Sequence, residues 1–204
     1  MHIVCLDLEG VLVPEIWIAF AEATGISAFR RTTRDEPDYD ALMHFRLDLL
    51  NKNRLKLPDI QRVIAAIDPL PGAVEFVNSL RSRTQVVIFS DTYTEFAAPL
   101  MAKLGYPTLF CNTLVVGEDG TITGYRLRQT NGKREAVRAL KSLNISVFAA
   151  GDSFNDLGMI HEAHAGCLFR APNTIRESEQ SIPCVDEYDA FLGVIDQFLS
   201  REFA

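Results

Sequence analysis

Residues 3–10 read Ile-Val-Cys-Leu-Asp-Leu-Glu-Gly, and this stretch decides how the rest of the chain is interpreted. The apolar run Ile3–Leu6 is typical of a buried strand. Asp7 ends that run, where a buried carboxylate is costly unless a partner or a reaction compensates it. Asp7 is therefore the first candidate for a functional residue.

Further short apolar runs follow along the chain, and amphipathic helical segments separate them. Buried runs that alternate with helices predict crossover connections, and hence a doubly wound parallel sheet with helices on both faces. The expected fold class is a three-layer α/β fold. The Asp119-Gly120 pair between two extended runs predicts a hairpin at an edge of the sheet. The predicted strands are Ile3–Leu6, Gln85–Phe89, Thr108–Phe110, Ser146–Ala150, Gly166–Phe169 and, with a weaker pattern, Ile182–Val185.

The interval between the first two strands is too long for a single crossover. A βαβ unit needs about 30 residues, whereas 82 residues lie between Asp7 and Ser90. The surplus has helical periodicity, and Asp68-Pro69-Leu70-Pro71-Gly72 is typical of a return to the main domain. We therefore expect a helical cap domain at residues 14–70, inserted into a catalytic core made of residues 1–13 and 71–204.

Composition limits the possible functions. The chain has 204 residues, is 48% hydrophobic and carries a formal charge of −7. It is long enough to bury a large core, and its acidic balance argues against nucleic acid as the principal partner. No apolar stretch approaches the roughly 18 residues of a membrane span, so no membrane partner is expected. The four cysteines show no C-x-x-C spacing, which predicts free thiols in a cytoplasmic protein.

Polar residues end three of the predicted strands. Asp7, Ser90 and Asp152 each follow an apolar run, and the carboxyl ends of parallel strands meet at the edge where open α/β sheets bind ligands. Asp7 and Asp152 supply hard oxygen ligands that suit Mg²⁺. A carboxylate can also act as a nucleophile toward a phosphoryl group. We therefore predict a Mg²⁺-dependent phosphoryl-transfer site with Asp7 as the nucleophile.

Other residues have the chemistry to assist such a reaction. The Ser90 hydroxyl and the Lys133 ammonium can bind the equatorial phosphoryl oxygens, which carry the charge of the transition state. A simpler interpretation makes Lys133 a solvated residue in the first turn of a helix. Asn155 is expected to donate to the substrate, and Asp156 is expected to orient the metal ligands rather than bind the metal.

Glu9 is the candidate for the general acid and base. It lies two residues beyond Asp7, and therefore on the same side if the chain stays extended. Its carboxyl group can protonate the departing alkoxide and later deprotonate the attacking nucleophile. Because the first step needs the protonated form, we expect a raised pKa for Glu9.

These motifs, in this order, resemble those of the haloacid dehalogenase superfamily of phosphotransferases. The resemblance implies a three-layer α/β fold with a helical cap between the first two motifs. It also implies that Asp7 is the nucleophile, that Glu9 is the acid and base, and that Mg²⁺ binds to Asp7, to the backbone carbonyl of Glu9 and to Asp152. The matching residues are Asp7-Leu8-Glu9-Gly10, Ser90, Lys133 and Gly151-Asp152 with Asp156.

The cap resembles that of the phosphoserine phosphatase branch. In that branch a Glu just after the first motif meets the substrate amine, and a cap Arg meets the substrate carboxylate. Glu15 and Arg46 match these two residues, although both could instead be surface charges. An anion and a bidentate cation suit the head group of an amino acid. The resemblance therefore implies phosphoserine as the substrate and a place in serine biosynthesis.

Two departures from the branch pattern affect the choice of acceptor. Glu9 replaces the usual Asp, and Ser90-Asp91-Thr92 replaces the common Ser-Gly-Gly. The combination is most similar to bifunctional members that can also pass the phosphoryl group to homoserine, for threonine biosynthesis. One extra methylene is worth only about 1–3 kcal/mol of discrimination, so homoserine is a plausible acceptor. Asp91 is expected in the substrate site, where it could contact the ammonium group of an acceptor.

The same residues admit other functions. A phosphatase of this superfamily for another small phosphate monoester would share the core motifs. A phospho-accepting receiver domain also uses an Asp, Mg²⁺, a hydroxyl and a Lys, but its acceptor Asp lies on a later, central strand. A catalytically silent binding protein would not need the full set of catalytic groups. The sequence leaves the oligomeric state open, a homodimer included.

Overall fold

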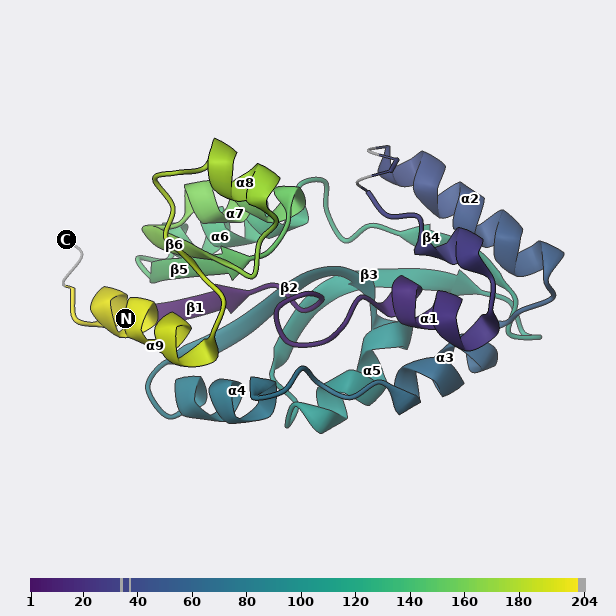
Figure 1. Cartoon of the computed structure of the whole chain (residues 1–204), viewed down its shortest axis with the longest axis horizontal. Helices are drawn as coiled ribbons and strands as arrows, with labels where there is room; N and C mark the ends of the chain where they lie inside the picture. The colour runs from purple at the N-terminus through teal and green to yellow at the C-terminus, as the bar shows by residue number, and fades with distance from the viewer. Residues whose placement is uncertain (34, 37, 202–204) are drawn as a thin grey trace.

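The computed structural model describes residues 1–33, 35–36 and 38–201, and in it a mostly parallel sheet lies between two layers of helices (Figure 1). Among these residues, seven strands form one sheet in the order β4-β3-β2-β1-β5-β6-β7. Neighbouring strands are parallel except β3 and β4, which form an antiparallel hairpin. The predicted three-layer α/β fold is confirmed. The strands are β1 His2–Leu6, β2 Gln85–Tyr93, β3 Thr108–Val116, β4 Ile122–Arg126, β5 Ser146–Gly151, β6 Ala165–Phe169 and β7 Cys184–Val185.

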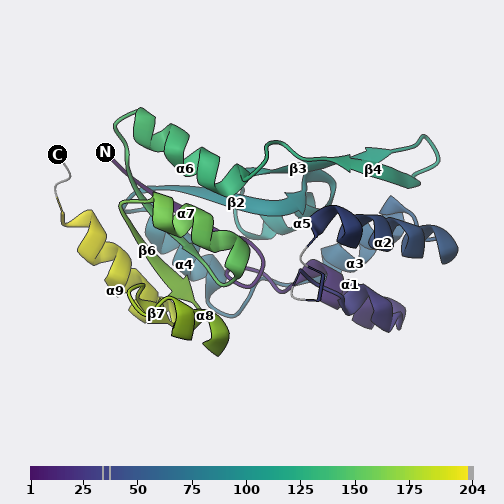
Figure 2. The same ribbon diagram turned by 90° about the horizontal axis from the view of Figure 1, so that it is seen from above.

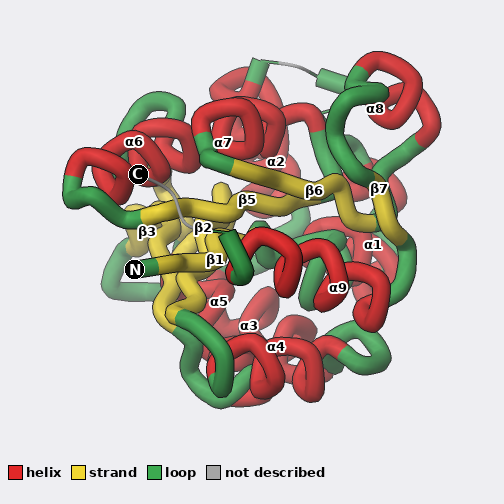
Figure 3. The backbone as a smooth tube through the Cα atoms, turned by 90° about the vertical axis from the view of Figure 1, so that its left-hand side faces the viewer, coloured by secondary structure: helices red, strands yellow, loops and turns green. Residues whose placement is uncertain are grey.

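Side chains on β1 alternate between the two helical layers, as the period of a strand requires. Ile3 and Cys5 pack in the core under helices α6 (Gly132–Ser142), α7 (Leu157–Glu162) and α8 (Asn173–Ser178). Val4 and Leu6 pack in the larger core, which includes α4 (Ala73–Arg81), α5 (Thr94–Lys103) and α9 (Tyr188–Leu199). The continuous apolar run of β1 follows from this burial on both faces (Figure 3).

Strand β1 lies near the centre of the sheet, between β2 and β5. The chain passes from β1 to β2 and β3 on one side, and later to β5, β6 and β7 on the other. Such a reversal of strand order opens a crevice outside the carboxyl ends of the strands. The residues that follow β1 and β5, together with the end of β2, therefore converge at one place.

Among the described residues between β1 and α4, four helical segments follow one another: α1 (Ile16–Thr24), η1 (Ser27–Arg30), α2 (Tyr39–Lys52) and α3 (Leu57–Ala66). They lie beyond the carboxyl end of the sheet, to the right in Figure 1. Their buried side chains belong to the same hydrophobic cluster as the larger core. The division into a core and a cap at residues 14–70 stays a prediction.

The β3–β4 hairpin reaches the cap helices (Figure 2). At its tip, Lys56 Nζ lies 2.8 Å from Asp119 Oδ2, and the backbone N–H of Leu57 donates to the carbonyl of Gly120. Strand β3 is continuous, whereas the sequence predicted separate extended runs at 108–110 and 114–116. The strand continues because β3 pairs with β2 up to Asn112 and then with β4 from Thr113 onward.

Two smaller predictions concern cysteines and membrane segments. The four cysteines are free thiols, as expected. Within the described residues, no helix combines the length and the apolar character that a membrane crossing requires.

Candidate active site

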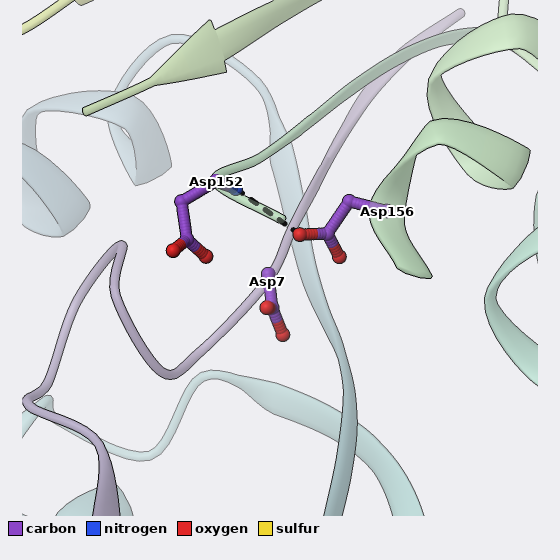
Figure 4. A group of neighbouring side chains, drawn as sticks. All are labelled: Asp7, Asp152 and Asp156. Carbon is purple, nitrogen blue, oxygen red and sulfur yellow. Dashed lines mark hydrogen bonds between the residues drawn. The ribbon is translucent and has the colours of Figure 1, made fainter. Parts of the chain in front are cut away.

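Three buried carboxylates meet at the carboxyl edge of the sheet (Figure 4). Asp7 follows β1, Asp152 follows β5, and Asp156 ends the short helix η2 (Phe154–Asp156). One oxygen from each of the three lies within 4.8 Å of the others. The convergence predicted for Asp7 and Asp152 is therefore present, and the group has the oxygen chemistry of a divalent-cation site.

Two glycines make room for these carboxylates. At Gly10 the backbone φ is +77°, and a Cβ there would lie 2.5 Å from Asp152 Cγ. A Cβ at Gly151 would lie 2.2 Å from Asp156 Cγ. Because real Cβ atoms do not approach so closely, each glycine is needed for its carboxylate to reach the site.

Asp156 is bonded within the protein through both of its oxygens. Its Oδ2 accepts hydrogen bonds from the backbone N–H of Asp152 at 3.1 Å and from the N–H and hydroxyl of Ser153 at 3.0 and 2.8 Å. Its Oδ1 accepts a hydrogen bond from Lys133 Nζ at 2.7 Å. This arrangement suits a residue that orients Asp152, because few lone pairs remain for a metal.

Lys133 is the cation of the cluster. Its Nζ lies 2.9 Å from Asp7 Oδ1, and the residue is 5% exposed, so its interpretation as a solvated helix residue is wrong. Burial alone would lower the pKa of Lys133, but Asp156, Asp7 and Asp91 outweigh it and raise the pKa well above its usual value. Lys133 is therefore a permanent ammonium.

The charge of the cluster is not balanced by this one ammonium. Burial raises the pKa of Asp7 well above its usual value, Asp156 raises it further, Lys133 lowers it, and Asp152 raises it again. Among the described residues, Lys133 pairs with Asp7 and Asp156, and Asp152 adds a third carboxylate to the group. The excess of negative charge at hard oxygens fits a bound divalent cation.

Glu9 has the raised pKa that its sequence position led us to expect. Burial, followed by the charge of Glu15, raises the pKa of Glu9 to about 8, against the opposing effects of the Ile16 N–H and of Arg46. The Ile16 N–H donates to Glu9 Oε2 at 2.9 Å, which fixes the orientation of the carboxyl group. Such a group is protonated near neutral pH and can donate a proton.

Ser90 and Asp91 lie at the end of β2 with different exposures. Ser90 is buried, and its Oγ accepts a hydrogen bond from the Thr92 N–H at 3.2 Å. The side chain of Asp91 is 46% exposed. Asp91 Oδ2 accepts a hydrogen bond from Asn155 Nδ2 at 2.7 Å and lies 3.8 Å from Lys133 Nζ.

Arg46 points from cap helix α2 toward this site. Its guanidinium carbon lies 4.6 Å from the ring centre of Trp17, and Nη2 donates to the carbonyl of Arg31 at 2.9 Å. The residue is 7% exposed, so it is not a surface charge. Arg46 Nε is buried and has no hydrogen-bond partner among the described residues, which leaves a donor available for a ligand.

A cavity of about 250 Å³ connects these groups. Its size suits a ligand with few non-hydrogen atoms. Glu15 lines this cavity together with Arg46, so the two residues predicted to meet an amino-acid head group share it with the acidic cluster. Asp156, the fully buried member of the cluster, is the one predicted site residue outside the lining. The predicted site residues in the lining are Asp7, Glu9, Glu15, Arg46, Ser90, Asp91, Lys133, Asp152 and Asn155.

The cavity also contains aromatic residues that the sequence did not reveal as site residues. The hydroxyl oxygens of Tyr39 and Tyr93 lie 2.7 Å apart, and the Tyr39 hydroxyl lies 3.2 Å from the Asp91 carbonyl. Trp17 is buried and also lines the cavity. Nothing in the local sequence separates such tyrosines from ordinary core aromatics, because their partner residues are distant in the chain.

Comparisons with known proteins agree with this geometry. The family model of haloacid dehalogenase-like hydrolases matches residues 1–164. Phosphoserine phosphatase ThrH of Pseudomonas aeruginosa is 60% identical over 190 residues, which cover 93% of this chain and 92% of that protein. A phosphoserine phosphatase of Pseudomonas syringae pv. tomato is 58% identical, over 93% of this chain and 80% of that protein. A solved substrate-bound phosphoserine phosphatase complex has the same fold, with a TM-score of 0.76 at 21% identity over 97% of each chain.

Proposed function

Because the chain belongs to the haloacid dehalogenase-like hydrolase family, we propose that it is a Mg²⁺-dependent phosphoserine phosphatase of serine biosynthesis, which can also transfer the phosphoryl group to homoserine. The observation that carries the proposal is the single cavity shared by the Asp7 cluster and by Glu15 and Arg46. The cluster has the chemistry for a phosphoryl group, and the other pair has the charges for an amino-acid head group. The names of the two Pseudomonas relatives support the same substrate.

The metal would be held by Asp7, Asp152 and the backbone carbonyl of Glu9. Bound there, Mg²⁺ would keep Asp7 ionised and draw charge from the phosphoryl oxygens. The excess of carboxylates over ammonium groups in the cluster supports this assignment.

The chain's own residues account for the two chemical steps. In the first, a carboxylate oxygen of Asp7 attacks phosphorus, the ester P–O bond breaks, and Glu9 gives its proton to the departing serine oxygen. In the second, Glu9 takes a proton from water or from the homoserine hydroxyl, whose oxygen attacks phosphorus and releases the Asp7 carboxylate. Throughout, Lys133, Ser90 and Asn155 hold the phosphoryl oxygens.

The head group of the substrate would lie at the cap side of the cavity. The carboxylate of phosphoserine would bind to Arg46, whose Nε has no protein partner among the described residues. Its ammonium group would lie near Glu15. Holding both groups fixes the phosphate relative to Asp7, which is the positioning contribution to the rate.

Phosphorus NMR with a panel of small phosphate monoesters tests the proposal. The purified protein with Mg²⁺ should release phosphate from phosphoserine faster than from phosphoethanolamine, which lacks the carboxylate, or from phospholactate, which lacks the amine. Faster release from an ester without an amino-acid head group would point instead to a phosphatase for another small monoester.

The acceptor is tested in the same tube. With homoserine added, a phosphohomoserine signal should grow while the phosphoserine signal declines. If inorganic phosphate is the sole product and homoserine does not change its rate of release, the proposed transferase activity is refuted and the proposed phosphatase activity remains.

A further inference from the structure

We propose that the Asp91 carboxylate occupies phosphate-binding donors in the ligand-free protein and must move away when a phosphate dianion binds. Asp91 is then a specificity-determining residue that weakens the hold of the site on inorganic phosphate. The inference rests on the proposed function in one respect only, which is that phosphate binds beside Asp7.

The contacts of Asp91 place its carboxylate among the proposed phosphate donors. Asn155 Nδ2 donates to Asp91 Oδ2 at 2.7 Å. The same oxygen lies 3.8 Å from Lys133 Nζ, which itself lies 2.9 Å from Asp7 Oδ1. A phosphoryl group on Asp7 would need the same amide and the same ammonium. The carboxylate and the phosphate therefore compete for them.

The backbone of Asp91 is held while its side chain is free to turn outward. The Asp91 carbonyl accepts a hydrogen bond from Asn112 Nδ2 at 3.1 Å and another from the Tyr39 hydroxyl at 3.2 Å. The side chain is 46% exposed, so it can rotate into solvent without leaving a cavity in the core. The displacement that the proposal requires is thus a change of one side-chain rotamer.

Electrostatics gives this displacement its effect on affinity. Lys133 already faces the charges of Asp156, Asp7 and Asp91. An incoming dianion adds negative charge beside Asp91, and like charges at such short range repel. Removing the Asp91 charge should therefore strengthen phosphate binding, whereas its presence should speed the release of phosphate as a product.

Isothermal titration of the Mg²⁺-loaded protein with inorganic phosphate tests the proposal without any turnover. Asp91→Asn keeps the shape of the side chain and removes its charge, and Asp91→Ala removes the competing group altogether. We expect both variants to bind phosphate about 10-fold more tightly than the wild type, the size usual for one partly exposed charge. Glu118→Gln, which makes the same charge change at the exposed hairpin tip, should bind as the wild type does.

Asn155→Ala separates displacement from a general effect of charge. If Asp91 competes for the Asn155 amide, the gain from Asp91→Ala should shrink in the Asn155→Ala background. Unchanged or weaker phosphate binding in both Asp91 variants would overturn the proposal, as would an equal gain with and without Asn155. If the Asp91 variants bind phosphate more tightly but the wild-type protein does not hydrolyse phosphoserine, the proposed function is refuted and this inference stands.

Discussion

Lys133 Nζ lies 2.9 Å from Asp7 Oδ1, so the proposed nucleophile is ion-paired to a buried ammonium before any ligand arrives. The same nitrogen lies 2.7 Å from Asp156 Oδ1. One cation therefore joins the nucleophile to the carboxylate that orients Asp152. The arrangement makes Lys133 a structural residue of the site as well as the proposed ligand for phosphate.

Replacing Lys133 with Met should destabilise the metal-free protein by about 3–5 kcal/mol, because the buried carboxylates of Asp7 and Asp156 lose the ammonium that pairs with them. The free energy of unfolding in urea measures the loss. The loss should shrink as the pH falls, because burial and the neighbouring carboxylates raise the pKa of Asp7 and so favour its uncharged form. Added Mg²⁺ should also recover part of it. Lys141→Met, which removes a partly exposed ion pair with Glu162, should cost at most about 1 kcal/mol.

Replacing Gly10 with Ala should abolish metal-dependent activity, because the new Cβ would lie 2.5 Å from Asp152 Cγ. Gly25 offers a matched control. Its φ is +71°, close to the +77° of Gly10, but a Cβ there would meet nothing within 4 Å. Gly25→Ala should therefore show only the backbone strain of about 1 kcal/mol and keep wild-type turnover. Equal losses of activity in the two variants would mean that strain, not the clash with Asp152, is responsible.

The pH dependence of turnover should report Glu9. Burial and the Glu15 charge raise the pKa of Glu9 to about 8. The proposed acid is protonated below this value and ionised above it, so kcat/KM for phosphoserine should fall as pH rises through about 8.

Glu9→Gln should lower kcat by about 10²–10⁴-fold, leave KM nearly unchanged and remove the alkaline fall. Steady-state kinetics between pH 6 and 9.5 would show both effects, with Glu118→Gln as the control. Wild-type rates in Glu9→Gln would exclude Glu9 from the mechanism.

Arg46→Lys should raise KM for phosphoserine roughly 10- to 100-fold, because a paired guanidinium contact to a carboxylate is worth about 1.5–3 kcal/mol. KM for phosphoethanolamine should change little, since that ester lacks the carboxylate. Arg30→Lys, on an exposed ion pair with Glu22, serves as the matched control. An equal rise of KM for both esters would mean that Arg46 supports the cap rather than the substrate.

The core of the site could be predicted from sequence because its residues stand at the ends of strands. Apolar runs locate strands, and parallel pairing then brings Asp7, Ser90 and Asp152 to one edge without further information. The spacing of Glu9 from Asp7 similarly fixes where its carboxyl lies.

Contacts between the cap and the sheet could not be predicted in this way. The Tyr39–Tyr93 hydroxyl contact depends on how α2 packs against β2. The stacking of Arg46 on Trp17 depends in the same way on how α2 packs near α1. The Asp91–Asn155 hydrogen bond likewise joins the end of β2 to the short helix η2, two elements that local periodicity does not relate. The length of strand β3 was underestimated for a related reason. Its middle is extended because it pairs with β2 and β4, not because its sequence has an apolar pattern.

The central place of β1 has a consequence for the order in which the protein is made. Its neighbours β2 and β5 come from distant parts of the chain, and Asp7 leaves the ribosome long before Lys133 and Asp152 do. Until α6 and β5 have been added, Asp7 lacks both Lys133 and Asp152. The proposed phosphoryl chemistry can therefore begin only when the second half of the sheet has paired beside the first.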